Sequence, residues 1–162
     1  MIAVFSLGAN LGDRLGFLQC GLDAVAAAAV AVEVSPVYET EPVGGPAQGP
    51  YLNAVLRAEL PADTDLGDLI GRAEGLAGRV RGRRWGPRTL DVDVVSVTGP
   101  HRVDPALTVP HPRARHRAFV LAPWLDLDPE ANLPGAGRVA ALLADVDRAG
   151  IRRRDDLRLV VG

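Results

Sequence analysis

Between Val30 and Leu60 the chain reads VAVEVSPVYETEPVGGPAQGPYLNAVLRAEL, and the pattern of this stretch predicts the centre of a sheet. Apolar and polar side chains alternate from Val30 to Tyr38 and again from Tyr51 to Leu60, as in strands that bury one face. The segment between them, Glu39 to Pro50, holds three prolines and three glycines, too many for a helix or a strand. We therefore predict two strands joined by a long loop, and loops of this length in a compact domain are usually functional.

The residues on either side of these strands each predict a further strand and a helix. Ile2 to Leu7 is a short apolar run that ends at Gly8, and Asp13 stands where the N-cap of a following helix is expected. Asp65 occupies the same place ahead of a second helix, and Thr89 to Val97 is typical of a strand. The order strand, helix, strand, strand, helix, strand is that of a ferredoxin-like α+β fold, an antiparallel sheet with helices on one face.

The last third of the chain adds elements to this βαββαβ core. We expect a short hairpin, a helical stretch near Arg115 to Leu121, a helix near Val139 to Val146 and a final strand from Leu157 to Val161. A chain of 162 residues that is 48% hydrophobic can bury one full core. We therefore predict one domain over residues 1–162.

Charge and composition exclude several classes of protein. The formal net charge is -2, from 18 basic and 20 acidic side chains, which does not suit a protein that coats a polyanion. Every basic side chain is an arginine. A phosphate-binding loop that needs a lysine is thereby excluded, and any phosphate clamp must consist of guanidinium groups.

The expected location of the protein is the cytoplasm. Cys20 is the one cysteine, so the chain forms no internal disulfide and no cysteine-rich metal site, which suits a reducing compartment. The first residues, MIAVFSLGANLGDR, do not resemble a secretion signal. The apolar run from Ala24 to Val32 is about half as long as a membrane span. We predict a cytoplasmic protein without a membrane partner, and a monomer because no long uncharged apolar face is left over.

The segment from Arg79 to Val95, RVRGRRWGPRTLDVDVV, carries the clearest chemical signal. Five arginines surround two glycines and a tryptophan, and a strand follows. Alternate strand residues share a face about 6.5 to 7 Å apart, so Asp91 and Asp93 point the same way while Val92 points into the core. Two such carboxylates can bind a pair of Mg²⁺ ions, and the arginines can bind phosphate. The alternative is that the aspartates form the solvated face of an edge strand and pair with the arginines.

Two further segments hold more polar residues than folding requires. In TVPHPRARHRAFVL, from Thr108 to Leu121, His111 lies between two prolines and ahead of several arginines, which indicates a second wall of an anion site with His111 donating to phosphate. Asn53 and Tyr51 share a strand face, and an amide beside an aromatic ring suits a flat heterocycle. A structural histidine and an exposed strand-face pair are the alternatives.

At these segments the sequence resembles the family of 6-hydroxymethyl-7,8-dihydropterin pyrophosphokinases, and the similarity covers nearly the whole chain. Four stretches carry it in order: SLGANLGDR at Ser6 to Arg14, SPVYETEPVGGPAQGPYLNAV at Ser35 to Val55, RWGPRTLDVDVV at Arg84 to Val95, and VPHPRARHRAFVLAPW at Val109 to Trp124. The resemblance implies a ferredoxin-like enzyme that transfers the diphosphate of ATP to the hydroxymethyl group of the pterin, a step of folate synthesis.

The resemblance also implies roles for individual residues. Asp91 and Asp93 match the pair that binds two Mg²⁺ ions between ATP and pterin, and Arg79 and Arg88 match arginines that assist the transfer. Contacts with ATP or its phosphates are implied for Glu74, Arg81, Trp85, Arg88, His111 and Arg117. The pterin pocket is implied at Thr40, Pro42, Val43, Tyr51, Asn53 and Phe119.

The chain departs from the family pattern at Glu41, where many relatives have proline, and at Arg115 and His116, where histidine and glutamate are common. On the main interpretation the partners are ATP and the pterin, without nucleic acid. The alternative from another class is a non-catalytic RNA-binding module, because ferredoxin-like sheets can stack bases. A net charge of -2 and an aromatic content of 4% count against it. A second enzyme alternative is a two-metal nucleotidyltransferase, which would release diphosphate rather than AMP.

Overall fold

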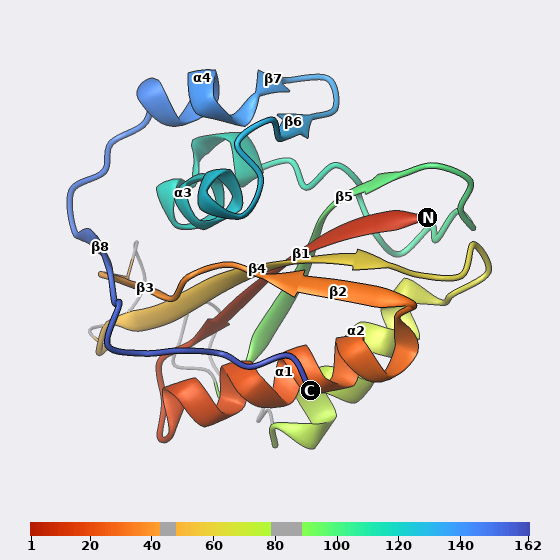
Figure 1. The fold of residues 1–162 in the computed structure, drawn as a ribbon, viewed down its shortest axis with the longest axis horizontal. Coiled ribbons are helices and arrows are strands. Elements are labelled where there is room, and N and C mark those ends of the chain that lie inside the picture. Colours follow the sequence, from red (N-terminus) through yellow and green to blue (C-terminus); the bar gives the residue numbers. More distant parts are fainter. Residues whose placement is uncertain (43–47, 79–88) are drawn as a thin grey trace.

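The sheet at the centre of the molecule is antiparallel throughout the described residues (Figure 1). The structure is a computed structural model that describes residues 1–42, 48–78 and 89–162. Strand order is β5-β1-β4-β3-β8, and β2 pairs with β4 beside β3. The strands are β1 (Ile2–Ala9), β2 (Ala31–Val34), β3 (Tyr38–Thr40), β4 (Tyr51–Glu59), β5 (Asp91–Thr98) and β8 (Ile151–Arg153).

Helices cover both faces of this sheet. The first pair, α1 (Arg14–Ala28) and α2 (Leu66–Leu76), packs on one face, and α3 (Ala118–Leu127) and α4 (Val139–Ala144) lie on the opposite side (Figure 1). Along β1, Phe5 and Leu7 are buried under α1 and α2, whereas Val4 is buried with α3 and α4. The predicted ferredoxin-like α+β fold is confirmed, and the C-terminal helices give the sheet a second covered face.

The predicted strand from Val30 to Tyr38 is divided into β2 and β3. At the break, the Ser35 hydroxyl accepts a hydrogen bond from the Val55 N–H at 2.9 Å and donates one to the Pro36 carbonyl at 2.8 Å. Pro36 has no N–H to continue the ladder. As a result β2 pairs with one end of β4 and β3 pairs with the other, where Tyr38 lies opposite Asn53.

The two predicted helix caps are confirmed. Asp13 accepts a hydrogen bond from the Gly16 N–H at 3.0 Å, and Asp65 accepts one from the Asp68 N–H at 2.9 Å. Strand β5 begins at Asp91, two residues after the predicted start. The first two residues of the predicted loop, Glu39 and Thr40, belong to β3 instead. Residues 43–47 of that loop lie outside the described residues.

The C-terminal third differs most from the prediction. The predicted helical stretch near Arg115 is a 3-10 turn (Ala114–His116) followed by the longer α3, and the short hairpin is β6 (Asn132–Leu133) with β7 (Gly137–Arg138). The predicted final strand from Leu157 to Val161 is wrong. Gln19 of α1 donates to the Val160 carbonyl at 2.8 Å and accepts from its N–H at 3.0 Å, so a side chain occupies the groups a strand would pair.

Within the described residues, none of the helices is both long and apolar enough to cross a membrane.

Replacing Ser35 with alanine should lower the free energy of unfolding by about 1 to 3 kcal/mol, because the buried Val55 N–H loses its side-chain acceptor. Urea unfolding followed by circular dichroism measures this. Thr98→Ala, which removes an exposed hydroxyl at the end of β5, is the matched control and should cost less than about 0.5 kcal/mol. Equal stability of the two variants would contradict a role for Ser35 at the strand break.

Candidate active site

A cavity of about 890 Å³ opens where β1, β3, β4 and β5 meet the start of α3. It lies on the sheet face that α3 covers, beyond the N-terminus of that helix. Nine of the residues singled out in the sequence line it together: Thr40, Pro42, Tyr51, Asn53, Asp91, Asp93, His111, Arg117 and Phe119.

The floor of the cavity is set by the register of three strands. Gly8 on β1 pairs with Asn53 on β4 and with Asp91 on β5, so these residues form one row across the sheet. Strand spacing places Asn53 and Asp91 about 10 Å apart on either side of the glycine. A Cβ atom at Gly8 would lie 3.1 Å from the Asn53 Oδ1 and 3.5 Å from a Tyr51 ring carbon. Glycine therefore keeps the floor open between the amide and the carboxylate.

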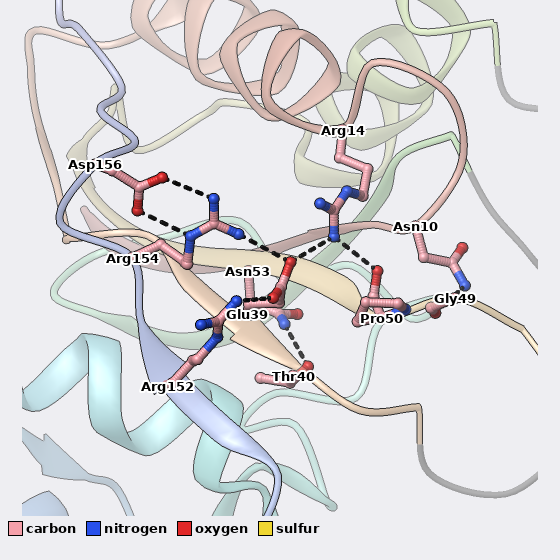
Figure 2. A network of polar contacts seen from close by, with 10 residues as sticks. All are labelled: Asn10, Arg14, Glu39, Thr40, Gly49, Pro50, Asn53, Arg152, Arg154 and Asp156. Carbon is pink, nitrogen blue, oxygen red and sulfur yellow. Dashed lines mark hydrogen bonds and ion pairs between the residues drawn. The ribbon is translucent and has the colours of Figure 1, made fainter.

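One end of the cavity presents an oriented amide and two aromatic rings. The Asn53 Nδ2 donates a hydrogen bond to the Thr40 hydroxyl at 2.8 Å, and both residues are only 3% exposed (Figure 2). This bond fixes the amide, so its oxygen lies beside Gly8. Burial raises the pKa of the Tyr51 hydroxyl, and the Asp91 charge raises it further. Phe119 lies at the start of α3, with the Arg117 guanidinium 5.4 Å from its ring centroid.

The other end presents the two predicted carboxylates. Asp91 and Asp93 both line the cavity, while Val92 and Val94 are buried under α1 and α2, as the period of a strand predicts. Asp93 keeps 35% of its side chain exposed. Glu74 on α2, for which ATP contacts were predicted, accepts a hydrogen bond from the Val92 N–H at 3.0 Å and is not among the residues that line the cavity.

A β-bulge helps to position His111. Val4 pairs with Ser96 and Phe5 pairs with Val94, so Val95 is an additional residue in β5. Its carbonyl accepts a hydrogen bond from the His111 N–H at 2.8 Å, which fixes the loop before α3 against the strand that carries the aspartates.

Arg117 and His111 face Asp93. The Arg117 Nη1 lies 3.7 Å from the Asp93 Oδ2, and the His111 Nε2 lies 4.0 Å from its Oδ1, which is too long for a hydrogen bond. The Arg113 N–H donates to the His111 Nδ1 at 3.2 Å, so a neutral His111 carries its proton on Nε2. Burial lowers the pKa of Arg117, although Asp93 opposes that shift.

Burial also lowers the pKa of the His111 imidazole, and the Arg117 and Arg113 charges lower it further, against an opposing effect of Asp91. His111 is therefore neutral at pH 7 and presents an N–H donor rather than a cation to the cavity.

Several cavity residues were not predicted from the sequence. His116, Glu41 and Gln48 add polar groups, and Asp147, Ala149 and Ile151 form a wall from the C-terminal segment. Glu41 and His116 had been noted only as departures from the family pattern. The pairing of β8 with β3 brings the C-terminal wall to the cavity. Strand β8 has only three residues, Ile151–Arg153, and one apolar side chain, so the sequence does not predict it. The predicted site residues Val43, Arg79, Arg81, Trp85 and Arg88 lie outside the described residues.

The lowered pKa of His111 predicts a titration midpoint below its ordinary value of 6.5. Because the folded protein then binds fewer protons than the unfolded chain, the His111 contribution to the free energy of unfolding falls as pH decreases below 6.5. Two-dimensional NMR of the imidazole C–H signals between pH 4 and 9 measures the midpoint, and His111→Gln assigns the signal. A midpoint at or above 6.5 would contradict the described burial.

Comparison with known proteins places these features in a family. The model of the family described as 7,8-dihydro-6-hydroxymethylpterin-pyrophosphokinase (HPPK) matches residues 4–129. The chain is 49% identical to the 2-amino-4-hydroxy-6-hydroxymethyldihydropteridine pyrophosphokinase of Mycobacterium leprae, over 92% of this chain and 86% of that protein. It is 40% identical to the Pseudomonas aeruginosa protein of the same name, over 91% and 93% of the two chains.

Solved structures agree on the fold. A Plasmodium falciparum HPPK-DHPS matches with a TM-score of 0.64 at 13% identity, over 88% of this chain. An HPPK-DHPS in complex with substrates matches with a TM-score of 0.66 at 10% identity, over 94% of this chain. The present chain spans less than half of those longer chains, 45% and 47% respectively. From the matched region and the identity to whole relatives, the chain belongs to the 7,8-dihydro-6-hydroxymethylpterin-pyrophosphokinase (HPPK) family.

Proposed function

We propose that the protein transfers the diphosphate of ATP to the hydroxymethyl group of 6-hydroxymethyl-7,8-dihydropterin, giving AMP and the pterin diphosphate, as a step of folate biosynthesis. The row of Asn53, Gly8 and Asp91 carries this proposal. On this proposal the flat pterin binds on the amide side of the row and the polyphosphate with its cations binds on the acidic side, on one open floor. The names of the relatives support the same reaction.

The pterin is proposed to occupy the end of the cavity at Tyr51, Asn53 and Phe119. A pterin has hydrogen-bond donors and acceptors on its edges and two flat apolar faces. The Asn53 amide, oriented by Thr40, reads the edge, and the aromatic rings contact the faces. Pro42 supplies a further wall, and Val43 remains a prediction for the same pocket.

Asp91 and Asp93, at the start of β5, fit Mg²⁺. Asp91 and Asp93 offer only oxygen ligands, and Mg²⁺ in proteins commonly takes one or two carboxylates together with water and substrate phosphates. Among the described residues no group of three or more His, Cys, Asp and Glu side chains gathers at one point, so the other ligands would have to come from ATP and water. When bound, the ions neutralise charge on the phosphates and lower the barrier to their transfer.

The chain's own residues are proposed to bind and orient the reactants. His111 donates a hydrogen bond from its Nε2–H to phosphate oxygens, and Arg117 donates hydrogen bonds from its guanidinium group, opposite the two aspartates. The hydroxyl oxygen forms a bond to the β-phosphorus, the bond from that phosphorus to the oxygen of the α-phosphate breaks, and AMP leaves. Asp91 is the proposed acceptor of the hydroxyl proton. ATP contacts at Glu74, Arg81 and Trp85 and roles for Arg79 and Arg88 in the transfer remain predictions.

The RNA-binding alternative is not supported. Modules that stack bases on a sheet use a broad open sheet face, whereas here α1 and α2 cover one face and α3 and α4 cover the middle of the other. The nucleotidyltransferase alternative shares the two carboxylates and differs in the leaving group. We further propose that residues 1–162 form one pyrophosphokinase domain that works as a monomer in the cytoplasm, where a single cysteine is compatible with a reducing environment.

The proposed reaction predicts AMP and a pterin diphosphate when the purified protein is mixed with ATP, Mg²⁺ and 6-hydroxymethyl-7,8-dihydropterin. ³¹P NMR distinguishes these products from the free diphosphate that a nucleotidyltransferase would release. AMP should form only with the pterin present, and excess EDTA should stop it because Asp91 and Asp93 need the cation to hold the phosphates. Unchanged ATP with folded protein and intact pterin would contradict the proposed function.

Asp93→Asn should lower kcat at least about a hundredfold, because a neutral amide holds a divalent cation far less well than a carboxylate. The fold should be kept, since this side chain is partly exposed. Steady-state kinetics with a thermal unfolding curve measure both effects. Asp63→Asn, in the exposed turn before α2, is the control and should leave turnover unchanged. Near-normal activity of the Asp93 variant would support the alternative of a solvated edge strand.

A further inference from the structure

Glu39 contacts three arginines, one from the start of α1 and two from the C-terminal segment, although it does not line the cavity (Figure 2). Its Oε2 accepts from Arg14 at 2.9 Å and from Arg154 at 3.1 Å, and its Oε1 accepts from Arg152 at 2.7 Å. The carboxylate is only 13% exposed. The hydrogen bond from Arg152, together with the hydrogen bond from Arg14 and the charges of Arg14 and Arg154, holds the pKa of Glu39 below its ordinary value.

The register of β3 explains why Glu39 lies outside the cavity while its neighbour lines it. Glu39 pairs with Leu52 on β4 and Arg152 on β8, on the sheet face that α1 covers. The next residue, Thr40, points to the opposite face and pairs with Tyr51 on one side and Ile151 on the other. Ile151, Thr40 and Tyr51 therefore form a row along the cavity, directly behind the carboxylate.

The arginines connect Glu39 to the other walls of the same cavity end. Arg14, at the start of α1, also donates to the Pro50 carbonyl at 3.0 Å, immediately before Tyr51. Arg154 holds Asp156 through two hydrogen bonds of 2.9 and 2.7 Å, and its backbone N–H donates to the Val37 carbonyl at 2.8 Å. The carboxylate thus joins the loop before β4, strand β3 and the C-terminal segment at one point.

The C-terminal segment adds the side chains of Arg152 and Arg154 to a short strand pairing. Its strand β8 has only three residues, and it pairs with β3 alone among the described strands. Without the Glu39 carboxylate, the three guanidinium groups would lie close together, and Asp156 would offer a negative charge to Arg154 only. Their mutual repulsion would shift the C-terminal wall and the loop before β4 from their places at the cavity, while the backbone pairing of β8 with β3 is kept.

We infer that Glu39 is a positioning residue that holds Tyr51, Thr40 and the C-terminal wall in the geometry that binds the pterin. This inference rests on the proposed function and adds to it a residue that touches neither substrate. It also gives the segment at Asp147–Ile151, which lies outside the region matched by the family model, a part in pterin binding.

The test compares Glu39→Gln with Glu33→Gln. Glutamine keeps the size of the side chain and removes its charge. Glu33 on β2 pairs with one arginine, Arg57 at 3.1 Å, with 61% of its side chain exposed, and it is therefore a matched control far from the cavity. Calorimetry with the pterin and a nonhydrolysable ATP analogue gives Kd, and kinetics give kcat and a separate KM for each substrate.

Glu39→Gln should raise the Kd and KM for the pterin about tenfold, and change kcat and the KM for ATP less than about threefold. The control should match the unaltered protein. The variant should fold, because β8 stays paired with β3 and Arg153 still contacts Asp126 of α3. A second variant, Arg152→Gln, removes a single partner that is 68% exposed and should raise the pterin Kd by a smaller factor.

An unchanged pterin Kd in Glu39→Gln, or equal changes in kcat and both KM values, would overturn the inference. The binding measurement separates it from the proposed function. If the unaltered protein binds the pterin without turning it over, the proposed reaction fails, and the ratio of the two Kd values still decides the role of Glu39.

Discussion

Strand β1 lies between β4 and β5, and the register of these two pairings determines the geometry of the site. Gly8 pairs with both Asn53 and Asp91. This register brings the Asn53 amide and the Asp91 carboxylate onto the same floor of the cavity. A shift of either pairing by one residue would turn Asp91 and Asp93 into the core or Asn53 away from the cavity. The buried side chains of β1 oppose such a shift, because Phe5 and Leu7 fill one core and Val4 fills the other.

The same constraint explains why the cavity lies at the end of the sheet. In the middle of β1 and β4 both faces are packed with apolar residues, and α3 and α4 close the second face there. Beyond the start of α3 the strands carry Thr40, Asn53 and Asp91 instead, and the space above them stays open. Polar side chains thus gather where helix packing ends, supported below by α1, whose first residue contacts Glu39.

The sequence allowed prediction of those parts of the site that depend on local periodicity. The period of a strand placed Asp91 with Asp93 on one face of their strand and Tyr51 with Asn53 on one face of theirs, and aspartates marked the two helix starts. These predictions succeeded because each depends on neighbours in the chain.

Features that depend on distant partners could not be predicted in this way. Alternation continues through Ser35, but the Val55 N–H that this hydroxyl binds lies on another strand. The run from Leu157 to Val161 has the pattern of a strand, and a glutamine of α1 takes its hydrogen bonds. The wall at Asp147 and Ile151 and the three arginines around Glu39 likewise come together only through the pairing of β3 with β8.

The central claim is that one open floor, divided by Gly8, holds the pterin and the polyphosphate side by side. A crystal structure with 6-hydroxymethylpterin, a nonhydrolysable ATP analogue and Mg²⁺ tests it most directly. We expect the pterin edge on Asn53 between Tyr51 and Phe119, and the phosphates with their cations on Asp91 and Asp93. A pterin bound away from Asn53, or phosphates that avoid the two aspartates, would contradict it.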